Sequence, residues 1–141
     1  MVSPRYLLDT NALSEAAKLH PSPVFMARLE RHRLEVAISA TTWHELVFGV
    51  ERLPPGRRRD GLVAFARGVV AGSMPILAYD EVAAAWHARE RARLTSLGRA
   101  PAAADGQIAA VAARHGLTLV TDNTRDFEGF LDLRLENWLL P

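Results

Sequence analysis

Short runs of consecutive hydrophobic residues alternate along the chain with longer stretches in which hydrophobic positions recur every three or four residues. The short runs predict β-strands at residues 6–8, 36–39, 76–79 and 117–121, with a weaker final strand near 133–138. Because these runs are hydrophobic on consecutive rather than alternate positions, they are typical of strands buried on both faces of a parallel sheet.

The longer stretches predict helices, and sequence signals mark where several of these helices end. Their expected bounds are Ser22 to Arg33, Thr42 to Leu53, Arg58 to Val70, Glu81 to Leu97 and Ala102 to Arg114, after a short first helix that follows Asn11. Gly98 and Gly116 directly follow two of these stretches, as is typical of helix ends. The alternation predicts an α/β fold, a three-layer α/β/α domain around a central parallel sheet of four or five strands.

Length and composition narrow the class of protein. The 141 residues predict a single domain spanning residues 1–141, with no room for a second core. No cysteine is present, which excludes disulfides, thiolate metal sites and a cysteine nucleophile. The net charge is +1, so any contact with nucleic acid must be local.

The hydrophobic runs are too short for a membrane protein. The longest uncharged one, residues 68–79, is interrupted by Gly72 and Pro75 and falls short of the ~20 residues that a spanning helix needs. Asp9 interrupts the hydrophobic segment near the N-terminus, unlike a secretory signal. We therefore expect a soluble, cytoplasmic protein with no membrane partner.

Acidic and amide side chains follow three of the predicted strands. Asp9 follows the first strand, Asn123 and Asp126 follow the fourth, and Glu45 lies in the helix after the second. Ligands bind outside the carboxyl ends of the strands in open sheets of this kind. Each of these residues alone also has a structural explanation, because Asp and Asn commonly cap helices. Asp80, directly before the predicted helix that starts at Glu81, is expected to be such a cap.

Asp105 is harder to explain as a surface residue. At 100° per residue it falls on the same helical stripe as Ile108 and Val111, which faces the core. A carboxylate that faces inward is costly to desolvate unless something pairs with it. A cation shared with other carboxylates would do so, and free amides in the first helical turn are the alternative.

Glu45 carries the opposite ambiguity. It points away from the hydrophobic stripe of its helix and has the spacing of a capping box with Thr42, in which its carboxylate would accept from the Thr42 amide. Taken alone, it is a cap or a solvated surface residue.

The combination of these residues points to metal chemistry. Four acidic positions from distant parts of the chain converge on one crevice in the predicted topology, where they repel one another unless a divalent cation neutralises them. Oxygen ligands without a cysteine or histidine cluster favour Mg²⁺, with Mn²⁺ as a plausible substitute. Such ions polarise phosphates and activate water, which predicts a metal-dependent phosphoryl-transfer enzyme.

Five sequence fragments, in order, carry a family resemblance. They are Leu7-Leu8-Asp9-Thr10-Asn11, Glu45-Leu46 with Gly49, residues 53–58, Ala104-Asp105-Gly106-Gln107-Ile108-Ala109-Ala110, and Thr121-Asp122-Asn123 with Asp126-Phe127. Over nearly the whole chain the sequence resembles PIN-domain ribonucleases, and specifically VapC-type toxins of type II toxin–antitoxin pairs. The resemblance implies a Mg²⁺-dependent endoribonuclease in which water attacks the RNA phosphate and leaves a 5′-phosphate and a 3′-hydroxyl.

The resemblance also implies roles for particular residues. Asp9 and Asp105 would hold the metal ion, and Glu45 would position the ion or its water. An acidic site after the fourth strand would complete the catalytic set, but Asn123 stands where some relatives carry Asp. Asp122 and Asp126 flank it, and the sequence leaves open which of the three faces the metal, with Asp126 favoured, followed by Asn123.

Partners and supporting residues follow from the same resemblance. Asn11 and Thr121 would orient the ligands by hydrogen bonding. The substrate would be RNA, the protein would form a homodimer, and a cognate antitoxin would block the site with its C-terminal segment. Phe48, off the core stripe of its helix, is either a contact for that segment or an ordinary exposed aromatic residue.

Two other function classes fit part of the pattern. A non-catalytic module would bind RNA or a protein through the same crevice. A phosphatase with an aspartyl nucleophile would also place Asp9 after the first strand, but it would carry a second Asp two positions later and a phosphate-binding lysine. Here Asn11 occupies that position, and Lys18 is the only lysine.

Overall fold

A computed structural model describes residues 3–72 and 74–141. Its centre is a sheet of five strands in the order β3-β2-β1-β4-β5, and every neighbouring pair is parallel. The strands are β1 (Tyr6–Leu8), β2 (Val36–Ser39), β3 (Ile76–Leu77), β4 (Thr118–Val120) and β5 (Leu135–Glu136). The predicted parallel sheet is confirmed, with the larger of the two expected strand numbers.

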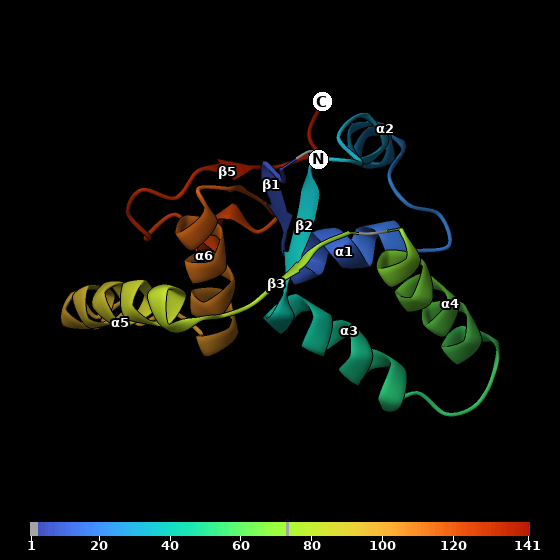
Figure 1. Ribbon diagram of the computed structural model, residues 1–141, viewed down its shortest axis with the longest axis horizontal. Coiled ribbons are helices and arrows are strands. Elements are labelled where there is room, and N and C mark those ends of the chain that lie inside the picture. The colour runs from blue at the N-terminus through green and yellow to red at the C-terminus, as the bar shows by residue number, and fades with distance from the viewer. Residues whose placement is uncertain (1–2, 73) are drawn as a thin grey trace.

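In the described residues, six α-helices and one 3₁₀ helix surround the sheet. They are α1 (Thr10–Ala17), α2 (Pro23–Arg31), α3 (Ala40–Glu51), α4 (Arg57–Ala71), α5 (Glu81–Ser96), α6 (Ala103–His115) and η1 (Thr124–Asp126). Figure 1 shows α6 in front of the sheet with α5 beside it, and α1 and α2 on the other side. This arrangement is the predicted three-layer α/β/α fold.

The inner strands supply side chains to both layers in alternation. Leu7 packs in a core cluster with residues of α5 and α6, including Leu94 and Ile108. Leu8, its neighbour, packs in a second cluster with Phe25 of α2 and with residues of α1 and α4. Both faces of β1 are therefore buried, which explains why its sequence is an unbroken hydrophobic run.

The expectation of burial on both faces is wrong for β3. This strand covers only Ile76–Leu77 rather than residues 76–79, and Ile76 is 38% exposed. It lies at the edge of the sheet, paired with β2 alone, so one of its sides has no neighbouring strand.

A helix must be long and hydrophobic enough to cross the hydrocarbon core of a bilayer. In residues 3–72 and 74–141, no helix has the length and hydrophobicity that a membrane crossing demands.

Candidate functional site

The order of the strands reverses at β1. The chain adds β2 and β3 on one side of β1 and later places β4 and β5 on its other side. The backbone N–H of Asp9, which directly follows β1, donates to the Val120 carbonyl at the end of β4 with an N···O distance of 3.0 Å. Asp9 therefore lies at the switch point of the sheet, where ligands bind in open α/β folds.

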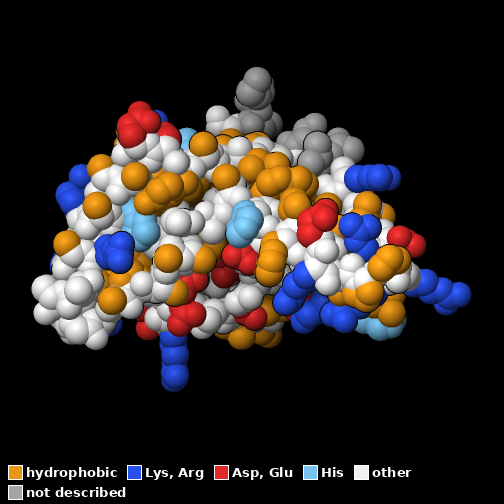
Figure 2. All heavy atoms as spheres, turned by 90° about the horizontal axis from the view of Figure 1, so that it is seen from below, with side chains coloured by type: hydrophobic (Ala, Val, Ile, Leu, Met, Phe, Trp, Pro, Cys, Tyr) orange, Lys and Arg blue, Asp and Glu red, His pale blue; other side chains and the backbone are white. Residues whose placement is uncertain are grey.

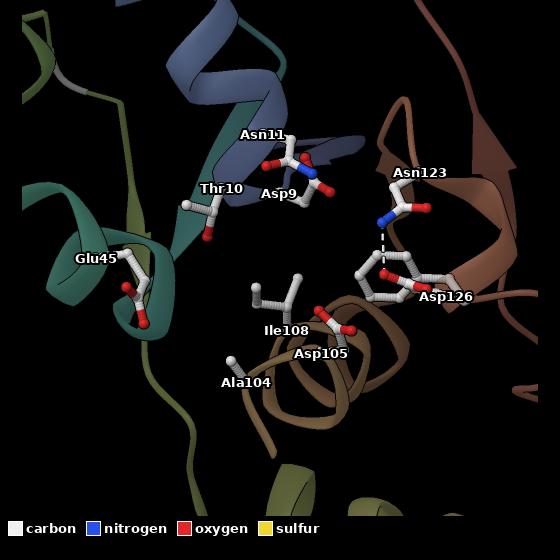
Figure 3. A pocket seen from close by; sticks show the side chains of 10 residues that line it. Asp9, Thr10, Asn11, Glu45, Ala104, Asp105, Ile108, Asn123 and Asp126 are labelled. Carbon is white, nitrogen blue, oxygen red and sulfur yellow. Dashed lines mark hydrogen bonds between the residues drawn. The ribbon is translucent and has the colours of Figure 1, made fainter. Parts of the chain in front are cut away.

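A cavity of about 200 Å³ opens at this switch point, and we call it the acidic cavity. All five predicted catalytic residues line it: Asp9, Glu45, Asp105, Asn123 and Asp126. Figure 3 shows Glu45 on one side, Asn123 and Asp126 on the opposite side, and Asp9 and Asp105 between them. The fold thus brings together residues that are up to 117 positions apart in sequence, counted from Asp9 to Asp126.

Asp9 is fixed by the start of α1. It is the N-cap of this helix, and its Oδ1 accepts a hydrogen bond from the Ala12 backbone N–H at 2.7 Å. The residue is only 3% exposed. One carboxylate oxygen thus satisfies a free amide of the helix start.

Glu45 reaches the cavity from the second turn of α3. The predicted capping box with Thr42 is wrong, because Ser39 is the N-cap and the helix begins at Ala40. The Thr42 backbone N–H donates to Ser39 Oγ at 3.1 Å, so it needs no carboxylate from Glu45. Glu45 is half-buried, and its side chain lines the cavity.

Asp105 lies in the first turn of α6, half-buried, with its carboxylate towards the cavity (Figure 3). Among the described residues it has no hydrogen-bond partner, so the alternative of a carboxylate held by helix amides gains no support. On the β4 side, Asn123 Nδ2 donates to Asp126 Oδ2, and both residues line the cavity. Asp122, whose orientation the sequence left open, does not line it.

Two carboxylates of the acidic cavity, those of Asp9 and Asp105, are harder to ionise than ordinary aspartates. The pKa of Asp9 is raised to about 6, chiefly by burial and also by the nearby Asp122 and Asp105, which together outweigh the lowering by hydrogen bonds from Thr121 and Ala12. Burial also raises the pKa of Asp105, with a further contribution from Asp126. These shifts show that negative charge here lacks compensation.

No basic side chain lines the acidic cavity. Within the described residues, neither Asp9 nor Asp105 forms an ion pair, and Glu45 Oε1 has only the His44 imidazole nearby, with Nδ1 at 3.8 Å. Figure 2 shows acidic side chains gathered in a hollow near the middle of one face, with basic side chains to either side.

The donor set fits Mg²⁺ bound through few protein ligands. No three histidine, aspartate or glutamate side chains among the described residues converge closely enough to form a complete metal cage. Mg²⁺ rarely uses such a cage, since it keeps several waters and binds one or two carboxylates together with substrate phosphates. Asp9 and Asp105, two uncompensated carboxylates on one cavity, meet that requirement.

Sequence reasoning missed several residues that shape the site. Thr10, Ala104, Ile108 and Phe127 also line the cavity. Thr41 Oγ1 donates to Gln107 Oε1 at 2.9 Å, which ties α3 to α6 beside the cavity. Thr10 could have been found from its place directly after Asp9, whereas no sequence pattern pairs Thr41 with Gln107.

A carboxylate-lined cavity at the switch point of a five-stranded parallel sheet places the chain among the open-sheet α/β proteins that bind their ligands at this edge. The chain belongs to the PIN domain family, whose model matches residues 6–130. The family resemblance seen in the sequence is thereby confirmed.

Relatives of known name agree with this assignment. The chain is 34% identical to the tRNA(fMet)-specific endonuclease VapC of Shigella flexneri, over 95% of this chain and 98% of that protein. It is 39% identical to toxin FitB of Neisseria gonorrhoeae, over 86% and 89% of the two chains.

Solved structures share the fold. A chain of FitAB bound to an IR36 DNA fragment superimposes with a TM-score of 0.86 at 34% identity, covering 96% of both chains. A chain of DNA-bound VapBC from Salmonella typhimurium gives a TM-score of 0.85 at 30% identity, over 96% of this chain and 98% of that one.

Proposed function

We propose that this protein is a Mg²⁺-dependent endoribonuclease that hydrolyses RNA phosphodiester bonds, and that it is the toxin of a type II toxin–antitoxin pair. The observation that carries the proposal is the buried, uncompensated Asp9 carboxylate, which shares one cavity with Asp105, Glu45 and Asp126. The names of its relatives, which include a tRNA-specific endonuclease and a toxin, support the substrate class and the biological role.

Asp9 and Asp105 would hold the metal ion. Bound there, Mg²⁺ would supply Lewis-acid polarisation of the RNA phosphate and a water of lowered pKa. Thr121 fixes the Asp9 carboxylate by a hydrogen bond, and the α1 amide of Ala12 holds its other side. The protein thereby presents a preformed ligand that needs no rearrangement to bind the ion.

The remaining cavity residues orient the reactants. Glu45 faces the site from α3, where its carboxylate would accept a proton from the attacking water or position that water. Asp126 and Asn123 are joined by a hydrogen bond on the opposite side, so that each restricts the rotation of the other. Asn11 also lines the cavity and is placed to donate to a ligand oxygen.

The partners follow from the same family membership. The similar chains come from structures of FitAB and VapBC assemblies, which supports a cognate antitoxin as the partner of this one. We also propose a homodimer. Phe48 is 52% exposed on α3, with the Arg52 guanidinium 5.5 Å from its ring centroid, and it offers an antitoxin segment an aromatic contact.

The test is cleavage of RNA by the purified protein with Mg²⁺ and with a chelator. Asp9→Asn should lower the cleavage rate by at least about a hundredfold, because the amide keeps the helix cap but binds Mg²⁺ poorly. Equal RNA binding with no cleavage by either protein would instead indicate a non-catalytic module.

Asp80→Asn is the matched control. Asp80 is also an N-cap aspartate that follows a strand, and its Oδ1 accepts from the Ala83 backbone N–H at 2.8 Å. It does not line the acidic cavity. Cleavage by Asp80→Asn should match that of the unsubstituted protein, and a comparable loss in both variants would point to folding rather than chemistry.

A further inference from the structure

A second cavity, of about 350 Å³, adjoins the acidic cavity. Asp105 and Asp126 line both cavities, so these two residues form a wall that the cavities share. The second cavity differs in charge, because Arg99 and Arg125 line it, and we call it the arginine cavity. Sequence reasoning singled out neither arginine.

Both arginines are exposed and lack a partner in the described part of the chain. Neither forms an ion pair or a side-chain hydrogen bond with any residue in 3–72 or 74–141. Other arginines nearby are engaged: Arg93 binds Glu90 through two hydrogen bonds of 2.9 Å, and Arg114 Nε lies 3.2 Å from Asp80 Oδ2. The two guanidinium groups of the arginine cavity therefore remain available to a ligand.

The wall that carries these groups is held in place. Arg93 Nη2 donates to the Gly129 carbonyl at 2.7 Å, and the Leu131 N–H donates to Glu90 Oε1 at 2.7 Å. The segment that follows η1 is thus fastened to α5. A Cβ on Gly129 would lie 3.7 Å from Arg99 Nη2, an ordinary van der Waals distance, so the Arg99 guanidinium lies beside this fastened segment.

Charge decides what such a pair of cavities can hold. A single-stranded RNA carries a negative charge at every nucleotide, and carboxylates repel each phosphate that no cation neutralises. A strand whose phosphate reaches the acidic cavity can continue past Asp105 and Asp126 into the arginine cavity, because these two residues line both. Arginine binds phosphate in a planar fork with two parallel hydrogen bonds, and it would offset that repulsion on the adjoining side.

We propose that Arg99 and Arg125 bind a backbone phosphate of the RNA strand adjacent to the phosphate that is cleaved. The inference rests on the proposed nuclease function, and it assigns the arginine cavity to the same substrate strand. An acidic peptide of a protein partner would also suit two arginines. RNA is favoured because the shared wall places both cavities along one continuous ligand path.

The test uses the Arg99→Gln/Arg125→Gln double variant and a short RNA that contains one mapped cleavage site. Binding is measured in an Asp9→Asn background so that the RNA stays intact. We expect the dissociation constant to rise about tenfold for the pair of lost contacts. The slope of log K against log salt should fall by about 0.7, the contribution of one phosphate contact on a single strand.

A neutral phosphate locates the contact. Replacing one phosphate beside the cleavage site by an uncharged methylphosphonate should weaken binding to the Asp9→Asn protein about tenfold, and should weaken the double variant no further. Equal losses in both proteins at every position would overturn the proposal.

Arg89→Gln/Arg91→Gln is the matched control. These two arginines are exposed on α5 and line neither cavity, and the control removes the same charge. If the control lowers RNA affinity as much as the double variant does, the arginine cavity has no special role. If only antitoxin affinity falls in the double variant, the arginines serve that protein and the proposal is wrong.

The outcome is separable from the test of cleavage. Failure of the nuclease proposal appears as absence of Asp9-dependent cleavage, whatever the arginines do. Failure of this inference appears as Asp9-dependent cleavage and RNA binding that are both insensitive to Arg99 and Arg125.

Discussion

Two aspartates with the same local role differ in their electrostatic surroundings. Asp9 and Asp80 both follow a strand and cap the next helix, and the sequence alone explains either as a cap. The pKa of Asp80 is lowered, chiefly by the Ala83 backbone hydrogen bond and also by Arg114, whereas burial raises that of Asp9. Helix capping could be read from local spacing, but the environment depends on residues more than thirty positions away.

Asp9→Asn should stabilise the metal-free protein near neutral pH. The folded-state pKa of about 6 lies above the ordinary 3.8, so the contribution of Asp9 is fully present below that value and is lost as pH rises through about 6. Removing the charge should raise the free energy of unfolding by on the order of 2 kcal/mol at about pH 7.5. Urea denaturation with a chelator measures this.

The gain should shrink as the pH falls towards about 3, below both pKa values, where the Asp9 carboxyl is largely protonated in both states. Asp80→Asn gives the opposite sign, because its lowered pKa contributes stability above the unfolded-state value that is lost as pH falls. A loss of stability in Asp9→Asn at neutral pH would contradict the uncompensated charge.

At the scale of elements, the contact between α5 and α6 depends on a glycine. His87 is 8% exposed, its Nδ1 lies 2.8 Å from the Tyr79 hydroxyl, and its Nε2 has no hydrogen-bond partner among the described residues. A Cβ on Gly106 would lie only 2.1 Å from that Nε2. Gly106 follows Asp105 directly, so this close contact also sets the position of the acidic cavity's α6 wall.

Gly106→Ala should lower the free energy of unfolding by about 1 to 3 kcal/mol, because the imidazole is confined and cannot swing away from the added methyl group. In a His87→Ala background the same change should become stabilising by about 0.5 to 1 kcal/mol, since alanine is the better helix former. Urea denaturation of all four proteins completes the cycle. Equal effects in both backgrounds would show that His87 is not the obstacle.

The start of α3 shows why helix boundaries were harder to predict than helices. Ser39 and Thr42 are both good N-cap residues, and the sequence placed the start at Thr42. In the structure Ser39 caps the helix while it still belongs to β2. Only the register of β2 beside β1 determines which of the two side chains lies at the helix end.

At the scale of the whole molecule, the inner strands β1 and β2 were predicted to the residue, because burial on both faces leaves an unbroken hydrophobic run. β4, although also an inner strand, covers only Thr118–Val120 of the predicted 117–121, and the outer strands β3 and β5, each with a strand on one side alone, are shorter than predicted as well. The acidic cavity could be predicted from the sequence, because its residues follow the strand ends. The arginine cavity could not, because Arg99 and Arg125 lie in connecting segments whose sequence has no periodic pattern.

Mg²⁺ should stabilise the molecule as a whole. An ion that binds only the folded state raises the free energy of unfolding by about 1.4 kcal/mol for each tenfold excess over its dissociation constant. The melting temperature should therefore rise with Mg²⁺ in the unsubstituted protein and in Asp80→Asn. It should stay nearly constant in Asp9→Asn, and an equal rise there would argue against Asp9 as a ligand.

The central place of β1 has a consequence for how the protein is made. β1 is synthesised early, but its second neighbour, β4, arrives only with residues 118–120, and Asn123 and Asp126 follow that strand. A nascent chain that has not yet acquired this segment has an open sheet and only part of the acidic cavity. The RNA cleavage proposed for the acidic cavity therefore requires a chain that has been translated through β4 and Asp126. Until then, the ribosome that synthesises the protein is not exposed to an active nuclease.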